Sequence, residues 1–429
     1  MAKYGLVLSS DGSKSSFEIG AWKALRELDV MLSAVSGSFV GALNAALIAQ
    51  GDFERAVRFW RNVSSKNLFD VSRFIAQKYT EEWSKADTKV FKKSFLKYIQ
   101  GKSAELDPLR EVLENFIDER AVRSSETRLG FVSVSLSTLE AEVLPIEKIP
   151  RGKLTQYLLA AACFPQISQV NRVADPQFSA RYSPYRIITG YNTTAILSTD
   201  DVAVVPPDVD ADVTLIHSSE AFELDFCESA ETMRRNIKLG YVDTLRLFQE
   251  SIGKTYFICK SAKEERFAQF QRGISRPLSG HLNDLLKMLL RINAPEKEAI
   301  EARLTQMLRA AGAPTQNLHL DMLEHTAKIL QVPKDEKYTL DKFILAICSR
   351  MNQCLTTGKR ELTDPQAVRR VILDVVEPGH SLPGGELFAQ YFLLLLSCKP
   401  ASYHKMQAFV GSLNLKTIVA MVTVLYLLY

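Results

Sequence analysis

The sequence lacks the residue patterns of metal-dependent, disulfide-rich and nucleic-acid-binding proteins. Its six cysteines are Cys163, Cys227, Cys259, Cys348, Cys354 and Cys398. They are scattered, with no C-x-x-C pair and no metal-ligand spacing, so we expect reduced thiols and no metal site. The net charge is only +4, and no basic stretch is interleaved with aromatic residues. Nucleic acid is therefore not an expected partner.

Long apolar runs are also missing. The apolar run at residues 5–8 is too short for a signal peptide and suits a buried strand. Residues 417–429 are uncharged, but a spanning helix needs about 20 residues. We expect this segment to be a buried terminal helix or strand, with a membrane-interface contact as the alternative. The expected location is cytoplasmic, with peripheral membrane association as the alternative.

Alternating strand and helix patterns are present in the first part of the chain. Strand patterns at 3–10 and 31–36 are each followed by helix patterns, which begin near residues 15 and 40. This alternation predicts an α/β fold with a mainly parallel sheet covered by helices. Further strands are predicted within 129–145 and at 202–205, 213–217 and 256–259.

After residue 262 the strand patterns give way to amphipathic helix patterns. They lie at 278–292, 296–311, 318–331, 339–354, 365–376 and 386–398. The sequence therefore predicts two domains, an α/β domain at 1–262 and an all-helical domain at 263–429.

The most informative motif lies between the second strand and its helix. Residues 37–41 read Gly-Ser-Phe-Val-Gly, which has the glycine spacing of a G-x-S-x-G nucleophile elbow. The central position, Phe39, carries a benzyl group instead of a hydroxyl. A phenyl ring cannot attack an ester carbonyl, so this motif questions whether the chain is an enzyme.

The motif and its surroundings resemble the patatin-like phospholipases over about residues 4–260. The resemblance is carried by the segments 6–25, 37–47, 158–165, 186–192 and 234–246. It implies a patatin-like three-layer fold and a serine–aspartate dyad that hydrolyses acyl esters of lipids. In that mechanism the serine attacks, the aspartate acts as base, and backbone N–H groups hold the oxyanion. It needs no cofactor and no metal.

Carried onto this chain, the resemblance places both dyad members on apolar residues. The nucleophile position falls on Phe39, between the elbow glycines Gly37 and Gly41. The acid position falls on Ile188, with Thr189 and Gly190 in the rest of the acid loop.

The oxyanion loop also departs from the family pattern. It would comprise Ser10, Asp11, Gly12 and Lys14, where the family has consecutive glycines. The Asp11 carboxylate would oppose the negative charge that develops in the transition state.

These changes predict a pseudoenzyme, retained to bind lipid, a membrane surface or a protein partner. The alternative is a residual acyl hydrolase that uses Ser38 or Ser36 as nucleophile. Asp200 or Asp201 is a less favoured candidate for a relocated acid. We further expect strained backbone geometry at Phe39, and its ring packed against Ile188 in the former cleft.

Overall fold

The structure is a computed structural model of the whole chain. It describes residues 3–10, 14–65, 107–134, 141–162, 183–191, 193, 195–199, 205–206, 209, 211–220, 222, 229–274, 276, 278–312, 317–361 and 384–429. The chain divides into two compact units, Met1–Gln249 and Glu250–Tyr429.

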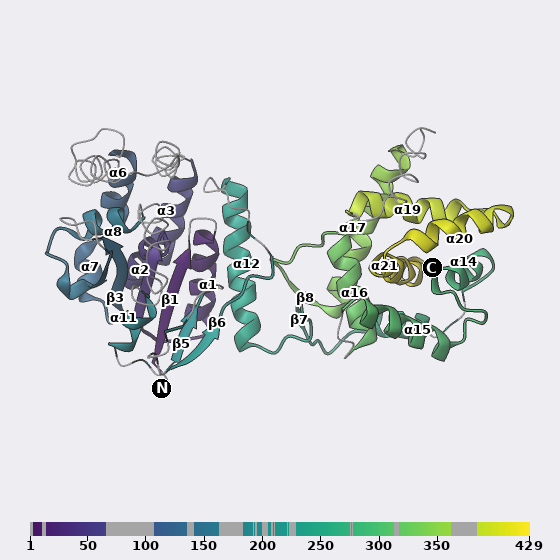
Figure 1. Cartoon of the computed structure of the whole chain (residues 1–429), viewed down its shortest axis with the longest axis horizontal. Coiled ribbons are helices and arrows are strands. Elements are labelled where there is room, and N and C mark those ends of the chain that lie inside the picture. The colour runs from purple at the N-terminus through teal and green to yellow at the C-terminus, as the bar shows by residue number, and fades with distance from the viewer. Residues whose placement is uncertain are drawn as a thin grey trace, which may run out of the picture. The chain divides into compact units, whose positions relative to one another are not determined.

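A six-stranded sheet forms the centre of the first unit (Figure 1). Its strands are β1 (Tyr4–Ser10), β2 (Leu32–Phe39), β3 (Arg128–Val134), β4 (Ala141–Pro145), β5 (Ala195–Ser198) and β6 (Asp212–Leu215). They run in the order β4-β3-β2-β1-β5-β6, and only β4 is antiparallel to its neighbour. The predicted mainly parallel sheet is confirmed.

Helices connect the strands of this sheet. They are α1 (Ser15–Glu27), α2 (Gly41–Gln50), α3 (Phe53–Ser65), α6 (Asp107–Phe116), α7 (Glu119–Ser124), α8 (Leu154–Ala162), α11 (Tyr185–Thr189) and α12 (Ala230–Phe248), with a 3₁₀ turn at Ile146–Lys148. The predicted strand–helix alternation is present as β1-α1-β2-α2. Strand β5 was not predicted, and most of the strand predicted at 202–205 lies outside the described residues.

Glycine allows α1 and α12 to pack with their backbones in direct contact. A Cβ atom on Gly20 would lie 1.9 Å from the carbonyl oxygen of Ile237, and one on Gly240 would lie 2.0 Å from that of Phe17. Only glycine fits at either position, because no other residue lacks a Cβ atom. The segment 234–246, which carries part of the family resemblance, thus contributes a glycine that positions α12 on α1.

The second unit is helical apart from one pair of short strands. Its helices are α13 (Glu265–Ile274), α14 (His281–Leu290), α15 (Lys297–Ala310), α16 (Leu318–Ile329), α17 (Leu340–Glu361), α19 (Gly385–Ser397), α20 (Tyr403–Ser412) and α21 (Leu415–Leu428), with a 3₁₀ turn at Pro400–Ser402. Five of the six predicted helices are present, and the sixth, at 365–376, lies outside the described residues.

Two strands change the expected outline of this unit. Strand β7 (Phe257–Cys259) was predicted as part of the first domain, but it pairs in parallel with β8 (Lys337–Thr339). The division of the chain at 249/250 therefore precedes the boundary predicted at 262/263. The helical second domain expected from the sequence is confirmed, and this short two-stranded sheet is an addition to it.

The terminal helix α21 lies in the interior of the second unit (Figure 1). Residues 417–426 are all buried, and α21 packs against α13, α14, α15, α16 and α17. The expected buried terminal helix is confirmed, and these apolar side chains form core instead of a membrane-contacting face. Among the described residues, no helix is long and apolar enough to cross a bilayer.

Candidate functional site

The elbow backbone is preserved at Phe39. Strand β2 ends there, and α2 begins two residues later at Gly41. The φ angle of Phe39 is +55°, in the left-handed region that residues other than glycine, asparagine and aspartate seldom adopt. The strained backbone expected at this position is confirmed.

The elbow glycines account for the sharpness of this turn. A Cβ atom on Gly37 would lie 2.2 Å from the carbonyl oxygen of Gly41 and 2.6 Å from the backbone nitrogen of Ala42. The first turn of α2 therefore rests directly on β2, and the chain must reverse sharply at residues 39–40. The half-buried ring of Phe39 packs against the main core of this unit, which includes Leu6 and Leu8 of β1.

Ile188 lies on the other face of the sheet. It is fully buried in a separate apolar cluster with Val7, and a Cβ atom on Gly5 would lie 2.2 Å from its Cγ2. Successive side chains of a strand point to opposite faces, so Gly5 and Val7 face away from Leu6 and Leu8. Ile188 is thus beneath the sheet, whereas Phe39 packs with the core above it.

Ile188 and Phe39 are also separated along the strands. Ile188 sits at Gly5, while Phe39 pairs with Ser10, five residues further along β1 and so about 16 Å away. The hypothesis that Phe39 packs against Ile188 is therefore wrong. Neither Ile188 nor the exposed Thr189 and Gly190 that end α11 faces the elbow.

The fallback serines share the face on which Ile188 lies. Ser36 is fully buried, and its hydroxyl donates a hydrogen bond to the carbonyl oxygen of Pro184, 2.9 Å away, just before α11. Ser38, also buried, is two residues further along β2 and so points to the same face. Neither serine takes the elbow position.

Part of the expected oxyanion loop lies outside the described residues. Ser10 ends β1, Asp11 and Gly12 are among the residues that are not described, and Lys14 directly precedes α1. The Lys14 ammonium donates to the carbonyl oxygen of Thr199 at 3.2 Å. Asp200 and Asp201 also lie outside the described residues.

A buried polar network that joins α1, α2 and the end of β5 was not predicted from the sequence. The Glu18 carboxylate accepts hydrogen bonds from Asn44 Nδ2 at 2.7 Å and from the Thr199 hydroxyl at 2.8 Å. Asn44 also donates to the carbonyl oxygen of Ser15 and accepts from Trp60 Nε1. The signal in the sequence was a single polar residue in each of two apolar stretches, Glu18 within 17–22 and Asn44 within 41–49.

The network explains how the two helix starts are held at the sheet. Glu18 lies in the first turn of α1, Asn44 lies in α2, and Thr199 follows β5. Both carboxylate oxygens of Glu18 are occupied by donors, and the group is completely buried. The geometry is that of a satisfied structural carboxylate. Across the described residues, no cluster of three His, Cys, Asp or Glu side chains is arranged to hold a metal.

The family comparison agrees with the elbow. Residues 6–187 match the family model described as patatin-like phospholipase. This segment is a patatin-like phospholipase domain. The match to the patatin-like family contains the whole elbow and stops one residue before Ile188. Ile188, Thr189 and Gly190 thus fall outside the patatin-like match.

Solved structures show only distant likeness. One is full-length SpcU in complex with full-length ExoU, from the type III secretion system of Pseudomonas aeruginosa, with 14% identity, TM-score 0.32, and coverage of 95% of this chain and 90% of that one. Another is VipD from Legionella pneumophila, with 12% identity, TM-score 0.28, and coverage of 100% and 92%. At these scores the patatin-like assignment stands on the family match and the sheet topology. Curated protein sequences gave no match.

Proposed function

We propose that this chain is a patatin-like pseudoenzyme, retained for binding a lipid, a membrane surface or a protein partner. The carrying observation is the preserved elbow backbone with phenylalanine at its centre. The position that would lift a nucleophile clear of the sheet holds a side chain with no nucleophilic atom. No cofactor enters this proposal.

The surroundings of Ser36 support the same conclusion. A nucleophile needs a base within hydrogen-bond reach. The Ser36 hydroxyl instead donates to a backbone carbonyl, which cannot take up its proton. The alternative, residual hydrolysis through Ser38 or Ser36, would require chemistry on the face of the sheet opposite the elbow core.

Hydrolysis assays on the purified full chain test this proposal. The substrates are a short-chain ester and a phospholipid, and the variants are the double substitution Ser36→Ala/Ser38→Ala and the single substitution Phe39→Ser. We expect all three proteins to show only background hydrolysis, and no serine of the wild type to be labelled by a fluorophosphonate. Wild-type turnover that disappears in the double variant would sink the proposal.

The binding part of the proposal needs a separate assay. Co-sedimentation of the full chain with neutral and anionic phospholipid vesicles tests the membrane arm and the expected peripheral, cytoplasmic location. Removal of residues 417–429 is not a usable variant, because α21 is part of the core of the second unit. Absence of the protein from both vesicle pellets would contradict membrane binding, and a protein partner would then be sought.

A further inference from the structure

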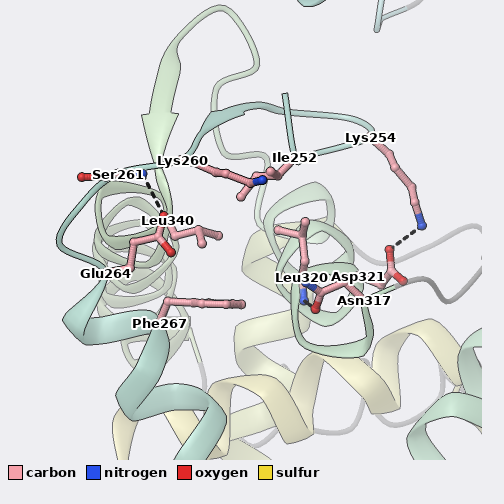
Figure 2. Close-up of a pocket in the computed structure, with 10 residues that line it drawn as sticks. All are labelled: Ile252, Lys254, Lys260, Ser261, Glu264, Phe267, Asn317, Leu320, Asp321 and Leu340. Atoms are coloured by element: carbon pink, nitrogen blue, oxygen red, sulfur yellow. Dashed lines mark hydrogen bonds and ion pairs between the residues drawn. The ribbon is translucent and has the colours of Figure 1, made fainter. Parts of the chain in front are cut away.

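A cavity of about 330 Å³ lies within the second unit, between the connector that carries β7 and the starts of three helices (Figure 2). Its apolar walls are Phe267 from the first turn of α13, Leu320 from the first turn of α16, and Leu340, which begins α17. All three side chains are buried. The volume is at the low end of the range for small-molecule sites, roughly 300–1,000 Å³.

Most charged groups that line the cavity already have partners. The Lys254 ammonium contacts the Asp321 carboxylate at 2.8 Å, and Figure 2 shows this pair directed away from Phe267 and Leu340. Glu264 accepts a hydrogen bond from the backbone N–H of Ser261 at 2.9 Å. The ion pair offsets the charge of Asp321, and the Ser261 N–H gives Glu264 a hydrogen-bond donor.

Lys260 is the exception. It is exposed, and it has no hydrogen-bond or ion-pair partner in the part of the chain that the structure describes. In Figure 2 its side chain reaches across the cavity toward Ile252, with Leu320 and Leu340 on the cavity wall below it. The cavity therefore combines an apolar floor with one unpaired cation at its mouth.

The starts of three helices also bear on the charge of a ligand in this cavity. Helices α13, α16 and α17 all begin at its walls, and the N-terminal end of a helix carries partial positive charge. At the start of α13 the N–H groups of Arg266 and Phe267 already donate to the Asp341 carboxylate, so they are not offered to a ligand. Asn317, which caps α16 through its side-chain oxygen, also lines the cavity. The group that the rim offers to a ligand is therefore the Lys260 ammonium, which suits an anionic head group.

We propose that this cavity binds an amphiphilic monocarboxylate of medium chain length. The hydrocarbon chain would lie on Phe267, Leu320 and Leu340, and the carboxylate would pair with Lys260. The volume suits one such chain and is too small for a whole phospholipid. This proposal goes beyond the proposed function and stands whether or not the first unit hydrolyses esters.

Calorimetric titration of the full chain tests the class of ligand. The three probes are decanoate, decanol and decylamine, each kept below the concentration at which it forms micelles. We expect decanoate to bind about tenfold more tightly than decanol, the gain of one charge-assisted contact, and decylamine to bind most weakly. Equal affinity for decanol, tighter binding of decylamine, or no binding of decanoate would each overturn the proposal.

Three variants locate the site. Lys260→Gln should weaken decanoate binding about tenfold and leave decanol unchanged, whereas the matched control Lys263→Gln removes an exposed lysine that does not line the cavity and should change neither. Ser261→Trp should block both probes by filling the mouth, with an unchanged circular dichroism spectrum as the check on folding. Decanoate affinity that survives Lys260→Gln or Ser261→Trp would place the ligand elsewhere and refute the assignment.

Discussion

The two positions to which the family resemblance assigns the catalytic dyad differ in what surrounds them. Phe39 occupies a turn whose backbone keeps the left-handed geometry of an elbow. Ile188 occupies a closed apolar site on the opposite face of the sheet, over Gly5. The first position has changed its side chain within a preserved backbone, whereas the second does not approach the elbow at all.

The difference has a physical cause. The elbow is held by backbone contacts, since Gly37 lets the first turn of α2 rest on β2 and Phe39 pairs with Ser10 of β1. Those contacts are part of the core and do not depend on a hydroxyl at residue 39. The position of Ile188 depends instead on its own side chain, which fills the space that Gly5 leaves by lacking a side chain. A polar residue should therefore be tolerated at the first position and rejected at the second.

The largest expected effect comes from restoring the family residue at the acid position. Ile188→Asp places a carboxyl group in a fully buried apolar cluster, and we expect the free energy of unfolding to fall by roughly 4 kcal/mol or more. Burial raises the pKa of a carboxyl group in the folded state, so the loss should be smallest at low pH, grow as the pH rises above the ordinary carboxyl pKa, and level off above the raised one.

Denaturation followed by tryptophan fluorescence measures this effect selectively. All three tryptophans, Trp22, Trp60 and Trp83, belong to the first unit. The control Ile188→Val keeps the site apolar and should cost only about 1 kcal/mol. Wild-type stability in Ile188→Asp would contradict the closed apolar site around residue 188. Ester hydrolysis by the double variant Phe39→Ser/Ile188→Asp would show that residue 188 reaches the elbow.

The fold was predictable where its pattern is local. The strand–helix alternation around residues 3–50 and the helices after residue 262 follow from hydrophobic periodicity, and both are present. Strand β5 has only four residues and was missed, although the equally short β6 was predicted. The pairing of β7 with β8 joins residues about 80 positions apart, and no local pattern reports such a contact.

The next largest effect is the difference in stability loss between alanine at a glycine of the elbow and alanine at a glycine of the assigned acid loop. Gly37→Ala would place a Cβ atom 2.2 Å from the carbonyl oxygen of Gly41, so α2 must move, and we expect a loss of roughly 3 kcal/mol. For Gly190→Ala the nearest atom is 3.4 Å away and φ is an ordinary −74°, so the change should stay within about 0.5 kcal/mol.

The same fluorescence-detected denaturation compares the two alanine variants directly. Equal losses at residues 37 and 190 would mean that the elbow glycine does not position α2. A large loss at 190 alone would mean that the segment after α11 is the more constrained of the two regions.

The candidate site was only partly predictable. The elbow is a five-residue motif whose glycines have a local purpose, so its turn and its strain could be inferred. The residues of α11 alone do not indicate the face of the sheet on which this helix packs. That face is set by glycines in distant strands, since Ile188 lies over Gly5 and Ile187 over Gly130. Glycine inside a strand pattern often marks such a close approach, and this was the signal available.

The smallest effect concerns a hydrogen bond between β2 and the residue that precedes α11. Ser36→Ala removes the buried hydroxyl that donates to the carbonyl oxygen of Pro184, and we expect a loss of about 1 kcal/mol with no change in ester hydrolysis. The exposed Ser124→Ala, which removes a 3.1 Å hydrogen bond to a carbonyl oxygen three residues earlier, is the matched control and should lose less. If Ser36→Ala abolished a measurable hydrolysis at unchanged stability, Ser36 would be a catalytic group. The reaction would then take place on the face of the sheet that α11 covers, and not at the elbow. A loss of stability alone leaves Ser36 as a fixed structural contact between the two regions.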